Sequence, residues 1–189
     1  MNIVKEIEKE VIKRCQSDSN KYGIGAWTHH IHSVVLNAKA LAKEYNADLE
    51  IVTLAALLHD IASVTDEKYY EDHHIIGAQI AEELLTNLNY PKERIELIKK
   101  CILNHRGSRL LEKLTKEEIC IADADSLAHF DNIPSLFSMV YKERNMSIEE
   151  GESYVKDKLK RSYKKLSKQG KEYTLEKYQN AMTIFKEGK

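Results

Sequence analysis

The sequence predicts an all-α protein, a helical bundle formed by one domain over residues 1–189. Only two prolines and seven glycines interrupt the 189 residues, so few positions break a helix. Apolar residues recur every three or four positions through most of the chain, and no stretch shows the period of two of a half-buried strand. No repeat, linker or low-complexity segment divides the chain. One all-helical domain is therefore the simplest arrangement.

The first half of the chain contains four predicted helices. The apolar periodicity places them at residues 3–15, 28–45, 49–62 and 73–88, with loops at 18–26 and 63–72. The third helix, LEIVTLAALLHDIA, is apolar on most sides, so it should be the buried central helix. Asp48 stands directly before it and can cap its N-terminus.

Start and stop signals divide the second half of the chain. Pro91 suits the first position of a fifth helix, which Gly107 ends. Two capping boxes begin the next two helices. Thr115-x-x-Glu118 begins a helix that continues to Leu127. Ser147-x-x-Glu150 begins a helix with one apolar stripe, formed by Tyr154/Val155, Leu159, Tyr163 and Leu166. The last helix is predicted from one apolar stripe: Leu175, Tyr178, Met182 and Phe185.

The charge is spread unevenly along the chain. The net charge is −1, which does not favour binding of the whole molecule to nucleic acid or membranes. Residues 151–189 contain 11 Lys and Arg against 5 Asp and Glu, a local charge of +6, so residues 1–150 carry −7. Two explanations stay open for the basic segment: a solvated helix face, or a surface that guides an anionic substrate electrostatically.

Composition and cysteine usage indicate a soluble protein in a reducing compartment. Apolar residues make up 42% and charged residues 31%, a typical balance for a globular protein. The N-terminal segment is charged from Lys5 onward, and no run approaches the roughly 18 apolar residues of a membrane span. The three cysteines show no CxxC spacing and should be buried free thiols: Cys15, Cys101 and Cys120. We therefore expect a cytoplasmic location.

Histidines and aspartates stand at unusual positions in the helical pattern. Four histidines each lie on the apolar stripe of a different helix, near one of its ends: His30, His59, His73 and His105. Asp60 follows His59 directly, and Asp123 and Asp125 lie among core-type residues of the sixth helix. A carboxylate on a buried face is costly unless it is paired or binds a metal. Such groups on separate helices can converge in the interior of a bundle to form a metal site.

Each of these residues also has a purely structural explanation. A single histidine on an apolar face is usually a core residue whose ring is hydrogen-bonded. The pair His59-Asp60 could equally cap the end of one helix and the start of the next. The joint pattern over four helices favours the metal site over these separate explanations.

Three segments carry a resemblance to a known family. HHIHSVVLNAKALA, AALLHDIA and ADADSL resemble the H…HD…D signature of the HD-domain superfamily of metal-dependent phosphohydrolases, over about residues 27–127. In that family the first His typically stands four residues before a Val and eight before an Ala, which selects His30 over its neighbours at 29 and 32. The resemblance implies an HD-type bundle with the metal in its interior, held by four ligands: His30, His59, Asp60 and Asp125. It implies catalytic roles for Asp60 and His59.

Two further histidines match a subset of the family. His73 opens a segment similar to H-P-x-x-G-A, and His105 ends the next helix, which by resemblance implies a second metal bridged to the first by Asp60. The sequence departs from that pattern in two places: no Pro directly follows His73, and Arg106-Gly107 follows His105 where a hydroxyl or acidic residue is common. The alternative is that both histidines contact substrate phosphate or cap their helices. Arg106 could clamp a phosphate oxygen or be a solvated residue at a helix end.

The ligand types define the cofactor and the expected chemistry. Imidazole and carboxylate without thiolate suit Mn²⁺, Fe²⁺, Co²⁺, Ni²⁺ or Zn²⁺, as one or two ions. The resemblance implies hydrolysis of a phosphoester or phosphoanhydride bond in a nucleotide or a related small phosphorylated molecule. A mixed-valent di-iron oxygenase and a catalytically silent metal- or nucleotide-binding regulatory module are the alternatives. We expect no membrane or nucleic-acid partner, and the sequence leaves the oligomeric state open.

The sequence predicts that Asp125, and not Asp123, is a metal ligand. The two residues lie about 200° apart around a helix with roughly 3.6 residues per turn, so both cannot face one ion. The family register selects Asp125, which precedes Ser126 and Leu127. Asp125→Asn should abolish metal binding and Asp123→Asn should retain most of it, as measured by metal analysis of the purified variants. The opposite result would reverse the assignment.

Overall fold

The computed structural model describes residues 2–105 and 115–185, and within these ranges every regular element is a helix. The prediction of an all-α protein is confirmed. The chain divides into two compact units, Met1–Asp125 and Ser126–Lys189, which are described separately below. The expectation of a single domain over residues 1–189 stays a prediction.

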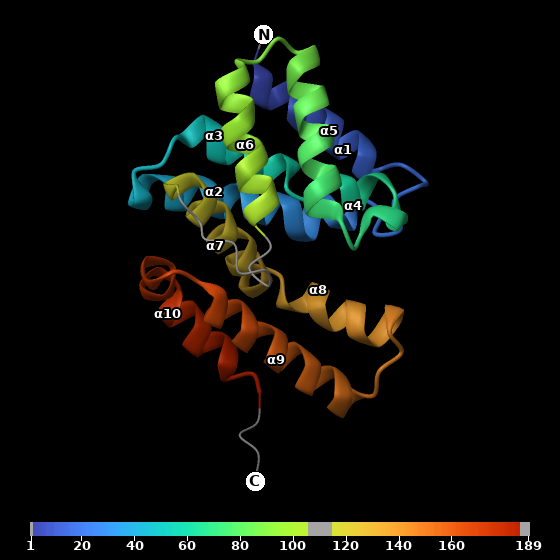
Figure 1. Cartoon of the computed structure of the whole chain (residues 1–189). Helices are drawn as coiled ribbons and strands as arrows, with labels where there is room; N and C mark the ends of the chain where they lie inside the picture. Colours follow the sequence, from blue (N-terminus) through green and yellow to red (C-terminus); the bar gives the residue numbers. More distant parts are fainter. Residues whose placement is uncertain (1, 106–114, 186–189) are drawn as a thin grey trace. The chain divides into compact units, whose positions relative to one another are not determined.

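The N-terminal unit contains seven α-helices and two short helical turns in its described residues (Figure 1). In chain order they are α1 (Ile3–Cys15), the π-helical turn η1 (Trp27–Ile31), α2 (His32–Tyr45), α3 (Leu49–Leu58), α4 (Ile61–Thr65), the 3₁₀ turn η2 (Glu67–Tyr69), α5 (His73–Asn87), α6 (Lys92–Asn104) and the first part of α7 (Lys116–Asp131). Helices α5 and α6 pack side by side as an antiparallel pair.

Helix α3 is the centre of this unit, as the sequence predicts. Its residues from Ile51 to Leu58 are all buried, and the helix packs against α1, α2, α5 and α6. Asp48 caps it by accepting hydrogen bonds from the backbone N–H groups of Glu50 and Ile51, both at 3.0 Å. Burial of each leucine side chain in this helix contributes about 1.5–3 kcal/mol, so α3 contributes strongly to the hydrophobic stabilisation of the unit.

The predicted helix over residues 49–62 is wrong in one respect. The α-helix ends at Leu58, Asp60 leaves the helical conformation with φ −110° and ψ 16°, and a new helix, α4, begins at Ile61. The predicted loop at 63–72 correspondingly contains the end of α4 and η2. The apolar pattern runs unbroken through the junction, so periodicity could not reveal it. The break turns the His59 and Asp60 side chains to a common side, which a continuous helix would not allow for adjacent residues.

Local signals set the other boundaries. Asn89 adopts the left-handed conformation, with φ 54°, in the turn between α5 and α6. Pro91 is the N-cap residue of α6, one position before the helical position expected from the sequence. Helix α6 ends at Asn104, and the predicted stop at Gly107 lies outside the described residues. Thr115 accepts a hydrogen bond from the Glu118 backbone N–H, which provides one half of the predicted capping box.

The first part of α7 is held against α2. The Tyr45 hydroxyl donates a hydrogen bond to the buried Asp123 carboxylate at 2.8 Å, and the Cys120 thiol donates to the Ala38 carbonyl at 3.4 Å. A buried carboxylate needs such a partner, so Asp123 is accounted for by its hydrogen bond. The expected buried free thiols are confirmed at all three cysteine positions.

The C-terminal unit consists of the end of α7, α8 (Ile133–Ser138), the π-helical turn η3 (Met139–Glu143), α9 (Ile148–Lys165) and α10 (Lys168–Met182). The sequence predicts the last two helices, whereas α8 and η3 were not predicted. The unit has its own apolar core, formed by Phe130, Val140, Val155, Leu159, Ala181 and Phe185. The rings of Tyr163 and Tyr178 stack at 4.0 Å beside it.

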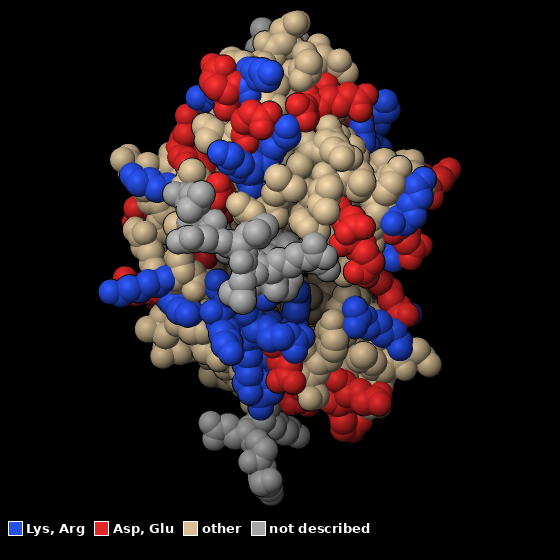
Figure 2. All heavy atoms as spheres, in the orientation of Figure 1, with Lys and Arg blue, Asp and Glu red and all other residues tan. Residues whose placement is uncertain are grey.

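Basic side chains gather over α9 and α10 on the face drawn in Figure 2. The exposed basic residues of these two helices include Lys160, Arg161, Lys164, Lys165, Lys168 and Lys177. This placement agrees with the charge asymmetry of the sequence and leaves open whether the surface is a solvated face or guides a substrate. None of the helices in the described ranges is both long and apolar enough to span a membrane.

The capping box of α9 gives a stability prediction. The Ser147 hydroxyl accepts from the Glu150 backbone N–H, and the Glu150 carboxylate accepts from the Ser147 N–H. Loss of such a cap costs about 0.5–2 kcal/mol. Ser147→Ala should therefore lower the free energy of unfolding by about 1 kcal/mol in denaturant titrations. Ser153→Ala, at an exposed position inside the same helix, is the control and should not destabilise.

Candidate metal centre

Six side chains of the N-terminal unit meet at one place, and they are the six that the sequence singles out as metal ligands or possible ligands. They are His30, His59, Asp60, His73, His105 and Asp125. Three of them, His59, His73 and His105, are buried, whereas His30, Asp60 and Asp125 are partly exposed. The group therefore has a buried side formed by histidines and an accessible side formed largely by carboxylates.

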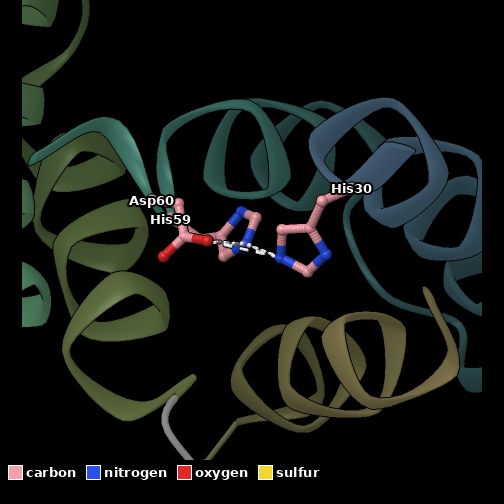
Figure 3. A group of neighbouring side chains, drawn as sticks. All are labelled: His30, His59 and Asp60. Carbon is pink, nitrogen blue, oxygen red and sulfur yellow. Dashed lines mark hydrogen bonds and ion pairs between the residues drawn. The ribbon is translucent and has the colours of Figure 1, made fainter. Parts of the chain in front are cut away.

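One half of the group surrounds the His30 ring (Figure 3). Its Nε2 atom lies 3.2 Å from Nε2 of His59 and 3.3 Å from Oδ2 of Asp60. The same oxygen of Asp60 lies 3.3 Å from Nε2 of His59. Asp125 approaches from α7, with its Oδ1 atom 3.3 Å from Nε2 of His30. His30, His59 and Asp60 thus form a cluster whose spacing could hold a metal ion.

The other half uses the second oxygen of Asp60. Nε2 of His73 and Nε2 of His105 lie 3.3 Å apart. Oδ1 of Asp60 lies 3.5 Å from the first and 3.9 Å from the second. In Figure 3 this oxygen points away from His30. Asp60, His73 and His105 form a second cluster that could hold a metal ion, so Asp60 belongs to both.

Interruptions and ends of helices bring these side chains together. His30 lies in the π-helical turn η1, an irregularity often found at functional sites. His59 and Asp60 lie at the break between α3 and α4. His73 is the first residue of α5, and His105 follows the last residue of α6. The α5–α6 pairing therefore places the start of one helix beside the end of the next.

Backbone carbonyl groups orient three of the four histidine rings. Nδ1 of His59 lies 2.8 Å from the Ala56 carbonyl oxygen. The same contact, to the carbonyl three residues earlier, recurs at 2.7 Å for His73 with Tyr70 and at 2.6 Å for His105 with Ile102. A carbonyl oxygen only accepts, so Nδ1 donates its proton in each case. In the neutral ring Nε2 then carries the lone pair that a metal requires.

This arrangement gives an independent test of whether the residues fit a metal. Because Nδ1 of each ring donates to a carbonyl group, Nε2 of His73 and Nε2 of His105 face each other across 3.3 Å, and in the Nδ1–H tautomer both of these atoms are acceptors. Two acceptors in contact repel each other unless a cation lies between them. Nitrogens at this separation, each about 2.1 Å from an ion, subtend about 100° at it, close to tetrahedral or octahedral angles. The donor set therefore fits a divalent transition metal.

Electrostatics divide the histidines into two kinds. Burial opposes a charge on His30, but hydrogen bonds to Asp125 and Asp60 outweigh it and raise its pKa to about 10. Burial and the positive charge on His59 lower the pKa of His105 to about 4, so this ring is neutral at pH 7. Burial opposes ionisation of Asp60, yet His59 and His30 hold its pKa well below its usual value. Asp60 is therefore the negative charge around which the histidines are arranged.

The geometry also places the residues whose roles the sequence left open. Asp125 lies at the cluster, whereas Asp123 is held by Tyr45, as the helical spacing predicts. The assignment of Asp125 as a ligand stays a prediction. Arg106 lies outside the described residues. The carbonyl groups that orient the rings cannot be identified from the sequence, because a backbone oxygen leaves no signal in residue identity.

Comparison with known proteins identifies the class. The HD domain family matches residues 27–129, more than half of the chain. The structure of Bacillus subtilis YpgQ superposes with a TM-score of 0.71 at 18% identity, covering 96% of this chain and 91% of that one. YpgQ in complex with ADP gives a TM-score of 0.68 at 19% identity, with coverages of 96% and 93%. At these identities the similarity concerns the fold alone.

Sequence relatives match over shorter segments. Ribonuclease Y of Petrotoga mobilis is 28% identical over 107 residues, which are 57% of this chain and 19% of that protein. An uncharacterized protein of Clostridium beijerinckii is 38% identical over 60 residues, 32% of this chain and 38% of that protein. This chain thus spans well under half of these relatives. The fold and the His/Asp clusters define an all-helical protein with a place for divalent metal.

The chain belongs to the HD domain family.

The pairing of His73 with His105 predicts a second metal position. His73→Ala/His105→Ala should lower the metal content from two ions per chain to one, because the His30 cluster keeps its own ligands. Elemental analysis after saturation with Mn²⁺ or Fe²⁺ measures this change. His29→Ala/His32→Ala is the matched control: both histidines are exposed, and this variant should keep two ions. A single ion in the saturated wild-type protein would contradict the second position.

Proposed function

We propose that this protein is a metal-dependent phosphohydrolase that cleaves a phosphoester or phosphoanhydride bond in a nucleotide or a related small molecule. One observation carries the proposal: each carboxylate oxygen of Asp60 faces a different histidine pair, Oδ2 toward His30 and His59 and Oδ1 toward His73 and His105. A carboxylate shared in this way suits a centre with two ions. In such a centre, divalent ions lower the pKa of bound water and neutralise charge on a phosphoryl group.

The chain's own residues hold that centre in place. Asp60 balances charge on both halves, and Asp125 adds a second carboxylate to the half that contains His30. The carbonyl groups of Ala56, Tyr70 and Ile102 fix three rings with Nε2 directed inward. Fixed rings need no reorganisation when a charged substrate arrives, which is the condition under which electrostatic stabilisation is most effective.

A nucleotide-like small molecule is the substrate class that we favour. The YpgQ structure with ADP covers nearly the whole of both chains, so it is the comparison most relevant to the ligand. Ribonuclease Y shares only about a fifth of its length with this chain, so its name gives weaker support for an RNA substrate. The metal centre also lies in the acidic part of the sequence, residues 1–150, where no excess positive charge attracts a nucleic-acid backbone.

The proposal predicts that hydrolysis depends on metal and on Asp60. Asp60→Ala removes the group shared by both clusters and should reduce turnover by about 10³-fold or more. Chelation should abolish activity, and added Mn²⁺, Fe²⁺ or Co²⁺ should restore it. A screen of phosphorylated metabolites measures turnover, and an unchanged helical circular dichroism signal shows that the variant folds.

Asp18→Ala provides the control, because Asp18 is an exposed carboxylate in the loop after α1. This variant should keep wild-type turnover. Full activity of the chelated protein would refute the mechanism. Turnover that consumes O₂ and requires a redox-active iron pair would favour the di-iron oxygenase, and metal binding without any turnover would favour the regulatory module.

A further inference from the structure

Two segments that precede and follow the metal ligands meet beside the centre, all within the N-terminal unit. They are the loop after α1 and the segment between α4 and α5, which lie side by side (Figure 1). The Ser19 hydroxyl donates to the Thr65 carbonyl at 3.0 Å, and the Arg14 guanidinium donates to the Thr65 hydroxyl at 2.8 Å. An ion pair between Lys21 and Glu67 joins the same segments.

The Lys21 ammonium lies among aromatic rings next to this junction. Its Nζ atom is 5.2 Å from the centre of the Tyr22 ring and 5.5 Å from the centre of the Tyr70 ring. Tyr70 is 44% exposed, its ring centre lies 6.1 Å from that of His73, and its carbonyl group orients the His73 ring. Lys21 is thus separated from a candidate metal ligand by one aromatic ring.

Tyr22 adds a hydroxyl group next to the Lys21 ammonium. Burial raises the pKa of Tyr22, and the Lys21 ammonium opposes the rise. The hydroxyl is therefore protonated at neutral pH. A hydroxyl and an ammonium next to each other are two hydrogen-bond donors for an anion.

The ion pair with Glu67 does not prevent Lys21 from binding an anion. The Lys21 and Glu67 side chains are 40% and 64% exposed, and exposed ion pairs contribute little to stability. A phosphate group carries more negative charge than one carboxylate and can replace Glu67 at the ammonium. Lysine is a frequent phosphate ligand because it acts as a mobile point charge on a flexible chain.

We propose that Lys21 and Tyr22 form a subsite for a second phosphate group, so that the substrate is a compound with linked phosphates and the bond cleaved is a phosphoanhydride. This inference rests on the proposed function, in which the first phosphate group lies at the Asp60 clusters. In a compound with linked phosphates, the second phosphate group would bind at the Lys21 ammonium, which Tyr70 joins to the His73 side of the clusters. A simple monoester has no second phosphate group to place there.

The test compares two anions on the protein loaded with Mn²⁺. Imidodiphosphate resists hydrolysis and carries two linked phosphates, whereas orthophosphate carries one. Lys21→Met should weaken imidodiphosphate binding in calorimetry by about tenfold, the effect of one charge-assisted hydrogen bond, and should change orthophosphate binding less than about twofold. Tyr22→Phe, which removes only the hydroxyl, should weaken imidodiphosphate binding by about threefold.

The Glu67→Gln variant shows whether Lys21 binds phosphate or only holds the two segments together through its ion pair. If Glu67 competes with phosphate for Lys21, its neutralisation should tighten imidodiphosphate binding or leave it unchanged. If the ion pair merely braces the two segments, Glu67→Gln and Lys21→Met should weaken binding alike, and that result would overturn the proposal. Lys68→Met is the matched control: Lys68 also pairs with an acidic residue, Asp66, and lies over a tyrosine ring, that of Tyr69, and its loss should change neither affinity.

The two proposals fail in different ways. If the wild-type protein hydrolyses phosphate compounds and Lys21→Met weakens both anions equally or neither of them, the subsite is wrong and the hydrolase proposal stands. If imidodiphosphate binding depends on Lys21 but no phosphate compound is hydrolysed, the subsite stands and the hydrolase proposal is wrong. Metal content measured on every variant shows whether a change in affinity arises from loss of Mn²⁺, which would also overturn the subsite.

Discussion

The structure around the metal centre depends on one constraint: four imidazole rings share the Asp60 carboxylate. His30 and His59 lie at one oxygen of this carboxylate, and His73 and His105 lie at the other. The rings of His73 and His105 are buried with their Nε2 atoms 3.3 Å apart, an arrangement that a cation between them stabilises, and such a cation needs an anion close by. Asp60 can supply this anion to both histidine pairs because α3 ends just before it.

The break between α3 and α4 is therefore the structural feature on which the site depends. In a continuous helix the His59 and Asp60 side chains would diverge by about 100°, the rotation per residue of an α-helix. The break directs both toward His30. Burial of α3 on nearly all sides supplies the hydrophobic stabilisation that allows an irregular junction to persist directly after it.

Backbone hydrogen bonds also orient the histidine rings that lie beyond this junction, in α5 and after α6. The first turn of α5 and the end of α6 hold His73 and His105, and each ring is tied to a carbonyl group three residues earlier in the chain. The segment that supplies the Tyr70 carbonyl also carries Glu67 and faces the loop with Lys21. The short segment between α4 and α5 thus orients the candidate metal ligand His73 and also contacts Lys21 of the proposed phosphate subsite. A change in this stretch is expected to affect both metal and substrate.

The sequence by itself determined the helical class, the buried central helix, the caps at Asp48 and Ser147, and the identity of the six residues that converge. Periodicity and capping residues are local signals, and the family register resolves His30 from its neighbours and Asp125 from Asp123. Only the tertiary structure decided that Asp60 divides its two oxygens between two histidine pairs, and that carbonyl groups of Ala56, Tyr70 and Ile102 orient three rings. It also brought Lys21 beside Tyr70, about fifty residues away in the sequence. The physical reason is that backbone oxygens carry no residue identity, and that contacts between distant segments are fixed by helix packing rather than by any pattern within one segment.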